Sequence, residues 1–91
     1  SMSDFRNHLS RMLKEPEFQR EYEAGKAEYE VTRALIAARI EQNLTQAQLA
    51  QKSGVRQSNI SRIENGTCSP TIATLEQLAS GMGKKLRIEF V

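Results

Sequence analysis

The stretch that decides the fold runs from Gln46 to Glu64: Gln-Ala-Gln-Leu-Ala-Gln-Lys-Ser-Gly-Val-Arg-Gln-Ser-Asn-Ile-Ser-Arg-Ile-Glu. Its pattern predicts two short helices joined by a turn at Gly54, because such a turn needs a residue that accepts positive φ. Ala50 has a side chain small enough for the two helices to cross closely. The apolar positions that remain form one inner seam, which consists of Leu49, Val55, Ile60 and Ile63.

The outer face of the second helix carries amide, hydroxyl and guanidinium groups, those of Gln57, Ser58, Asn59, Ser61 and Arg62. Such groups bond to base edges and phosphates in DNA. In a helix that enters a major groove with its N-terminal end towards the bases, Gln57, Ser58 and Arg62 become the base-contacting residues. Gln matches adenine and Arg matches guanine, and each pair discriminates by about 1 to 3 kcal/mol. The alternative is an ordinary solvated surface, which the glycine turn and the seam disfavour.

Residues from about 33 to 82 resemble the lambda-repressor/Cro-like (XRE) helix-turn-helix family at these positions. The resemblance implies a mainly α fold, a lambda-repressor-like helix-turn-helix bundle, with the same three base-contacting residues. It places four further side chains near phosphates: Gln46, Asn59, Asn65 and Thr67. Asn59 has an alternative role as a base-contacting residue, because neighbouring positions at a helix tip share the groove. The basic Arg56 and Lys52 are expected to add attraction to any phosphate backbone.

The same resemblance gives Arg39 and Glu64 a structural role, because the family pairs an arginine and a glutamate at these positions beneath the motif. It implies a partly buried ion pair that holds the second motif helix to the helix before the motif. Removing one partner of a deeply buried pair costs about 3 to 5 kcal/mol, since the other charge is left uncompensated.

Apolar periodicity and capping residues predict further helices at residues 4–14, 17–24 and 27–42 and after Thr71. Gly25 is expected to end the second of these, because glycine disfavours a helix interior. The helix at residues 27–42 is expected to face inward with Val31, Leu35, Ile36, Ala38 and Ile40. The helix after Thr71 is expected to face inward with Ile72, Leu75, Leu78 and Ala79. Thr45 and Gln48 have the spacing of a capping box.

The last eight residues, Lys84 to Val91, alternate between polar and apolar and predict a short C-terminal β-strand. One strand cannot satisfy its own backbone groups, so a second molecule is expected to supply the pairing strand. The expected organisation is an N-terminal helical extension (2–26), a DNA-binding domain (27–83) and this strand (84–91). A homodimer would place two recognition helices on an inverted-repeat operator, with half-site centres about 34 Å apart.

Charge is unevenly distributed along the 91 residues, whose net charge is +2. Residues 1–30 contain seven acidic and five basic side chains, whereas residues 31–91 contain four acidic and eight basic ones. The basic part, residues 31–91, therefore suits phosphate, and the acidic part, residues 1–30, suits a basic partner. Solvated helix faces can also differ in charge in this way.

Several function classes are disfavoured by composition. No apolar run approaches the roughly 20 residues that span a bilayer and no signal-peptide pattern is present, so we expect a cytoplasmic protein without membrane contact. Cys68 and His8 are the only residues of their types, which leaves no Cys/His metal cluster and no base for an activated thiolate. We therefore expect no metal, no cofactor and no catalysis, since a helical domain this small also offers little room for a substrate pocket.

Two further segments resemble HigA-type antitoxins. Residues 13–23, Leu-Lys-Glu-Pro-Glu-Phe-Gln-Arg-Glu-Tyr-Glu, are similar to the leader of that family, and residues 81–90 are similar to its closing segment. The resemblance implies an antitoxin that binds a basic, RelE/HigB-like mRNA-cleaving toxin and represses its own operon. An acidic helical arm suits the basic surface of an RNA-cleaving enzyme. The expected toxin-contacting residues are Phe5, Leu9, Met12, Phe18 and Tyr22.

Two alternatives to toxin binding stay open. The N-terminal helices can instead pack on the DNA-binding domain or extend a dimer interface. A standalone phage-type repressor shares the DNA chemistry and needs no toxin.

Overall fold

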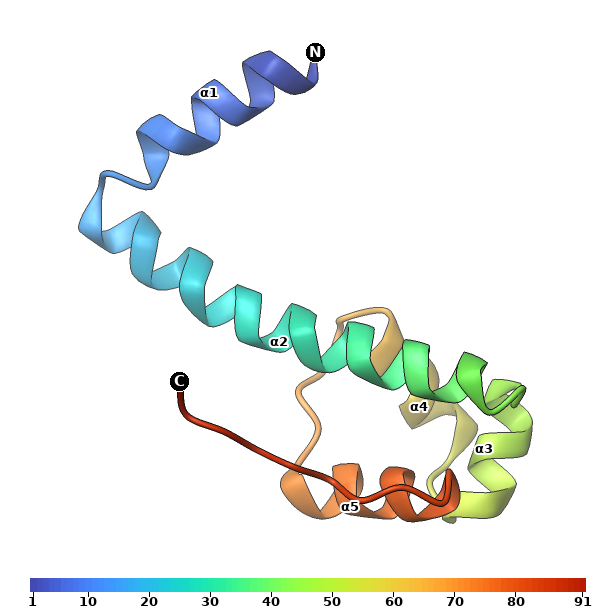
Figure 1. The fold of residues 1–91 in the computed structure, drawn as a ribbon. Helices are drawn as coiled ribbons and strands as arrows, with labels where there is room; N and C mark the ends of the chain where they lie inside the picture. Colours follow the sequence, from blue (N-terminus) through green and yellow to red (C-terminus); the bar gives the residue numbers. More distant parts are fainter. The chain divides into compact units, whose positions relative to one another are not determined.

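The computed structural model describes all 91 residues and is helical apart from its connecting segments and an extended C-terminal segment (Figure 1). The helices are α1 (Met2–Met12), α2 (Pro16–Glu41), α3 (Gln46–Ser53), α4 (Gln57–Glu64) and α5 (Ile72–Gly81). They belong to two compact units, residues 1–30 and 31–91, and α2 contributes to both. None of these helices has the length and apolar character needed to cross a membrane.

The unit of residues 31–91 is built around one apolar core. Its buried members are Leu35, Leu49, Val55, Ile60, Ile63, Leu78 and Met82. All four residues of the predicted seam belong to this core, which confirms that part of the sequence prediction. Each fully buried aliphatic side chain contributes about 1.5 to 3 kcal/mol relative to an exposed one.

Two residues predicted to be in the core are mainly exposed. Ile40 is 60% exposed and Ile72 is 58% exposed. At 3.6 residues per turn, Ile40 lies roughly 140° around α2 from the buried Leu35. By the same geometry, Ile72 lies roughly 120° around α5 from the buried Leu78. Both are therefore off the inward side of their helices, and Ile72 becomes part of a surface groove.

The turn at the centre of the motif has the geometry that its sequence predicts. Thr45 and Gln48 form a complete capping box at the start of α3, with hydrogen bonds of 3.0 and 2.9 Å between each side chain and the other's backbone N–H. Gly54 ends α3 in the left-handed conformation, with φ of 76°. Because no atom lies within 4 Å of where its Cβ would be, backbone conformation alone favours glycine there.

The N-terminal helices differ from the prediction. Residues 16–41 form the single helix α2 rather than two helices separated at Gly25. A glycine costs only about 1 kcal/mol relative to alanine in a helix interior and keeps its N–H, so good helix formers on both sides carry the helix through it. The first helix also begins earlier than expected, at Met2, because Ser1 caps it by accepting a hydrogen bond from the backbone N–H of Asp4.

The predicted C-terminal β-strand is wrong for the single chain. Residues 84–91 form an extended segment without strand pairing, which runs back along α5 (Figure 1). Its one backbone hydrogen bond joins the N–H of Lys84 to the carbonyl of Ala79, at 2.8 Å. The physical reason is that strand structure requires a neighbouring strand, and the chain provides none.

Candidate DNA-binding surface

Helix α4 presents one polar face to solvent and buries the opposite face completely. Gln57, Ser58 and Arg62 are exposed. Ile60 and Ile63 on the inner face have no exposed surface. Ser58 and Arg62 are four positions apart and therefore share one side of the helix. The structure thus brings the three predicted base-contacting residues together on the open side of a firmly anchored helix.

The first turn of α4 leaves backbone donors available. Arg56 is the exposed N-cap residue and forms no side-chain capping bond. Within the helix, the first N–H groups with a backbone acceptor are those of Asn59 and Ile60, both of which bond to the carbonyl of Arg56. The preceding N–H groups point out of the positive end of the helix dipole, where a phosphate is favoured.

Asn59 is less accessible than its three neighbours. It is half-buried, and its Oδ1 accepts a hydrogen bond from the Cys68 thiol, with Sγ and Oδ1 3.8 Å apart. This contact leaves the Nδ2 group of Asn59 as the free donor, which suits an acceptor such as a phosphate oxygen. Cys68 itself is half-buried and packs against the core.

The other predicted phosphate-contacting residues occupy different environments. Asn65, Thr67 and Lys52 are exposed, and the Thr67 hydroxyl donates to the Arg62 carbonyl at 3.1 Å. Gln46 is half-buried, and its Nε2 donates to Oε1 of Glu64 at 3.1 Å. The Gln46 side chain is thus held within the protein, and one of its amide protons is already used there.

Arg39 and Glu64 join α2 to α4 through a two-point ion pair. Nε of Arg39 lies 2.7 Å from Oε2 of Glu64, and Nη2 of Arg39 lies 2.9 Å from Oε1. The third guanidinium nitrogen, Nη1, donates to the Leu44 carbonyl at 2.9 Å. The two side chains are 16% and 5% exposed. The hydrogen bond to Glu64 raises the pKa of Arg39 above its already strongly basic value, so the arginine stays charged at every ordinary pH.

One contact beneath the motif was not predicted from the sequence. The Thr32 hydroxyl of α2 donates to the Ile63 carbonyl of α4 at 3.0 Å. The Ile63 carbonyl also accepts a hydrogen bond from the Gly66 N–H at 3.1 Å, so Thr32 uses its second lone pair and ties the end of α4 to α2. The available signal was a hydroxyl three residues before the buried Leu35, on the inward side of the helix.

The unit of residues 1–30 carries the predicted toxin-contacting side chains with unequal exposure. Phe5 is 60% exposed, while Leu9, Met12 and Phe18 are half-buried. The rings of Phe18 and Tyr22 stack, with centroids 6.3 Å apart. No residue of α1 is fully buried. This unit therefore keeps apolar surface accessible to solvent.

The motif geometry agrees with a comparison against family models, in which residues 35–88 match the helix-turn-helix model. The chain belongs to the helix-turn-helix family of DNA-binding regulators. The family match begins at the buried Leu35 of α2 and continues through α5 into the C-terminal segment. It therefore includes every side chain of the α4 surface described above.

Three similar proteins show which parts this helix-turn-helix chain shares with known relatives. The chain is 41% identical over 52 residues to an uncharacterized HTH-type transcriptional regulator, y4dL, of Sinorhizobium fredii (57% of this chain, 26% of the relative). It is 43% identical over 54 residues to an uncharacterized HTH-type transcriptional regulator of Haemophilus influenzae (59% and 55%). It is 31% identical over 74 residues to the antitoxin HigA1 of Mycobacterium tuberculosis (81% and 50%).

The chain thus spans between a quarter and just over half of the length of these curated relatives. No solved structure matches it.

Proposed function

We propose that this helix-turn-helix protein binds a specific double-stranded DNA sequence with α4 in the major groove. The observation that carries the proposal is the contrast between the two faces of α4. Gln57, Ser58 and Arg62 are exposed on one face, while the opposite face has no accessible apolar surface. A helix fixed in this way loses little conformational freedom on binding, so its polar groups are preorganised for base edges.

Around these three residues, the proposed phosphate contacts form a rim. Lys52 and Arg56 contribute charge, and Asn59, Asn65 and Thr67 contribute hydrogen-bonding groups. Gln46 is proposed to contribute through its remaining amide proton and its backbone N–H at the start of α3. The protein acts as a homodimer on an inverted repeat, with two copies of α4 in successive major grooves about 34 Å apart.

We further propose that the protein is an antitoxin that neutralises a basic RelE/HigB-like toxin and represses its own operon. The similarity to HigA1 covers 81% of the chain. Residues 31–91 make up only about two thirds of the chain, so this similarity extends into residues 1–30. That unit has excess acidic charge, which attracts a basic partner. Its apolar side chains Phe5 and Tyr22 are accessible for contact with such a partner.

A standalone repressor is the second candidate function. The two transcriptional regulators are more similar to the chain than HigA1 is, at 41% and 43% identity. Their similarity covers less than 60% of the chain, which is about the length of the helix-turn-helix region alone. This similarity therefore supports DNA binding, which the antitoxin and the standalone repressor have in common, and it does not favour either of them.

Co-expression with the product of the neighbouring gene distinguishes the two candidates. An antitoxin is expected to copurify with a small basic protein and to relieve its inhibition of growth. A Phe5→Glu variant should lose the complex but keep DNA binding, whereas Arg62→Ala should keep the complex and lose operator specificity. If the wild-type protein forms no complex and gives no relief while it still binds the operator, the standalone repressor is correct.

A further inference from the structure

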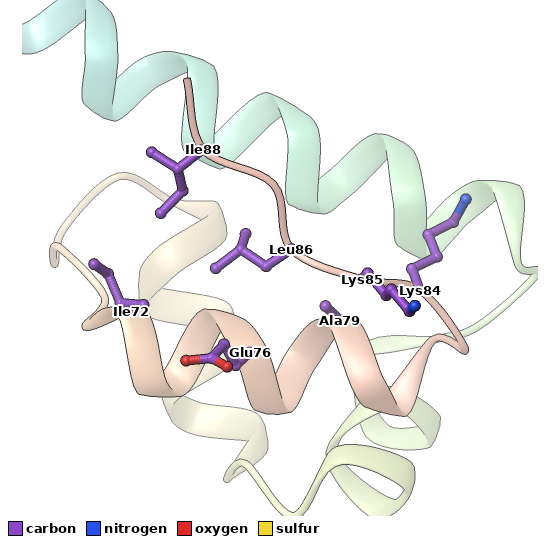
Figure 2. A pocket seen from close by; sticks show the side chains of 7 residues that line it. All are labelled: Ile72, Glu76, Ala79, Lys84, Lys85, Leu86 and Ile88. Carbon is purple, nitrogen blue, oxygen red and sulfur yellow. The ribbon is translucent and has the colours of Figure 1, made fainter. Parts of the chain in front are cut away.

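The surface groove between α5 and the extended C-terminal segment carries charges of both signs. Figure 2 shows Glu76 of α5 and Lys84 and Lys85 of the segment among its lining side chains. These mixed charges favour neither an acidic nor a basic partner. A surface with charge of a single sign lies instead on α2, within the unit of residues 1–30.

One side of α2 within residues 17–30 combines carboxylates with aromatic rings. At 3.6 residues per turn, a sector of roughly 140°, the acidic–aromatic sector, contains Glu17, Phe18, Glu21, Tyr22, Gly25, Glu28 and Tyr29. All of its members are exposed except Phe18, which is half-buried. Arg20 and Lys26, the basic residues of the same stretch, lie outside the sector, so its charge is negative throughout.

Gly25 leaves an open position in the middle of the acidic–aromatic sector. Apart from adjacent residues and the helix backbone, no atom lies within 4 Å of where its Cβ would be. On a helix surface, the neighbours of a residue are three and four positions away. For Gly25 these neighbours are Glu21, Tyr22, Glu28 and Tyr29. The Tyr22 ring stacks on Phe18, with centroids 6.3 Å apart, which holds it on the N-terminal side of Gly25.

An arginine side chain has the chemistry that suits this open position. Its guanidinium group is planar and always charged, stacks on aromatic rings and donates paired hydrogen bonds to carboxylates. Tyr22 and Tyr29 are seven positions apart, which is about 10.5 Å along the helix axis. Three stacked planar groups span about 7 to 8 Å, so a guanidinium fits between the two rings. A lysine ammonium can approach the carboxylates but has no plane that stacks on the rings.

We propose that an arginine of a basic partner protein inserts at Gly25, between Tyr22 and Tyr29 and beside the carboxylates of Glu21 and Glu28. The partner is a protein rather than a nucleic acid, because the carboxylates of the sector repel phosphate. The proposal rests on the proposed antitoxin function and names a contact that the basic toxin makes. It extends the toxin-contacting surface along α2 as far as Tyr29, which is 60% exposed.

Filling the open position tests the insertion. Gly25→Leu places a branched side chain where the arginine is expected, and it raises the helix propensity of α2, so a loss of binding would not come from unfolding. Ala27→Leu is the matched control, because Ala27 is exposed and lies roughly 160° around the helix from Gly25. Affinity for the purified product of the neighbouring gene should fall about tenfold for Gly25→Leu and stay close to wild type for Ala27→Leu. Equal affinities of the two variants overturn the proposal.

Removing carboxylates in pairs separates a local contact from general attraction between opposite charges. Glu21→Gln with Glu28→Gln removes two charges beside Gly25. Glu23→Gln with Glu30→Gln removes two exposed charges of the same spacing, roughly 160° around the helix from the first pair. The first double variant should bind the neighbouring gene product about tenfold more weakly, and the second should bind nearly as well as wild type. Equal losses would mean that only overall charge matters and would overturn the proposal.

A probe that needs no toxin separates failure of this proposal from failure of the proposed function. In an NMR titration of the full chain, an oligoarginine peptide should shift the Gly25 amide signal more than an oligolysine peptide of equal length. Glu21→Gln with Glu28→Gln should abolish this difference. If the neighbouring gene product does not bind but the peptides differ in this way, the antitoxin function is wrong and the arginine site stands. If the product binds all variants equally well, the antitoxin function stands and the arginine site is wrong. No complex and no difference between the peptides would overturn both.

Discussion

Gly81 of α5 and Ser53 of α3 approach so closely that no side chain fits between them at position 81. A Cβ atom added to Gly81 would lie 2.8 Å from both Cα and Cβ of Ser53 and 2.9 Å from its backbone nitrogen. Two of these three atoms belong to the backbone, which cannot move aside as a flexible side chain can. The glycine therefore sets the separation of α5 from the end of α3, directly before the turn at Gly54.

Gly81→Ala should destabilise the fold despite the higher helix propensity of alanine. Forcing an extra methyl group into a packed contact typically costs about 1 to 3 kcal/mol. Gly25→Ala is the matched control, because no atom lies within 4 Å of its added Cβ and its φ is not positive. That control should be neutral or more stable by up to about 1 kcal/mol. Chemical denaturation of both variants checks the prediction, and equal stability of the two would contradict it.

Glu64→Ala should be among the most damaging polar substitutions in the chain. It leaves the guanidinium of Arg39 with only the Leu44 carbonyl and removes the acceptor of Gln46. Arg39 is only 16% exposed, so we expect a loss of about 3 kcal/mol in the free energy of unfolding. Glu64→Gln keeps the shape and one acceptor and should lose less. Thermal melts that show no change for Glu64→Ala would contradict the structural role of the pair.

Gly54→Ala should destabilise the turn through the backbone alone. The residue has φ of 76°, and the space around its missing Cβ is empty. A side chain in the left-handed region costs about 1 to 2 kcal/mol. Gly54→Asn should cost less, because asparagine tolerates this region, as Asn43 does here with φ of 56°. Urea titrations in which the two variants are equally stable would show that another contact limits this position.

Local rules were sufficient to predict the motif because its determinants are close together in the sequence. The capping box of Thr45 and Gln48 and the turn at Gly54 depend on residues within a few positions of one another. The buried seam combines Leu49 of α3, Val55 of the turn, and Ile60 and Ile63, which are three positions apart on one face of α4. By contrast, the Thr32 hydrogen bond and the fixed orientation of Gln46 join residues 31 and 18 positions apart. No local pattern specifies such contacts.

The errors of the sequence prediction also have identifiable physical causes. Gly25 is predicted to end a helix, but the free-energy cost of one glycine in a helix interior is small. The helix-forming residues on both sides outweigh it. The alternation of residues 84–91 predicted a β-strand, which the single chain does not form because it provides no neighbouring strand. Ile72 is predicted to face the core because it has helical spacing to Leu75 and Ala79, whereas in the structure it lines the groove beside that segment.

Arg62→Ala and Lys52→Ala should weaken DNA binding in different ways. Arg62 is exposed on α4, so its loss should reduce discrimination at one base pair by about 1 to 3 kcal/mol. Lys52 is exposed at the end of α3 and carries only charge, so its loss should weaken binding to all sequences and lower the salt slope by about one. Binding to an operator and its single-base variants, measured across salt concentrations, separates these effects. Identical sequence and salt profiles for the two variants would mean that Arg62 contacts the backbone rather than a base.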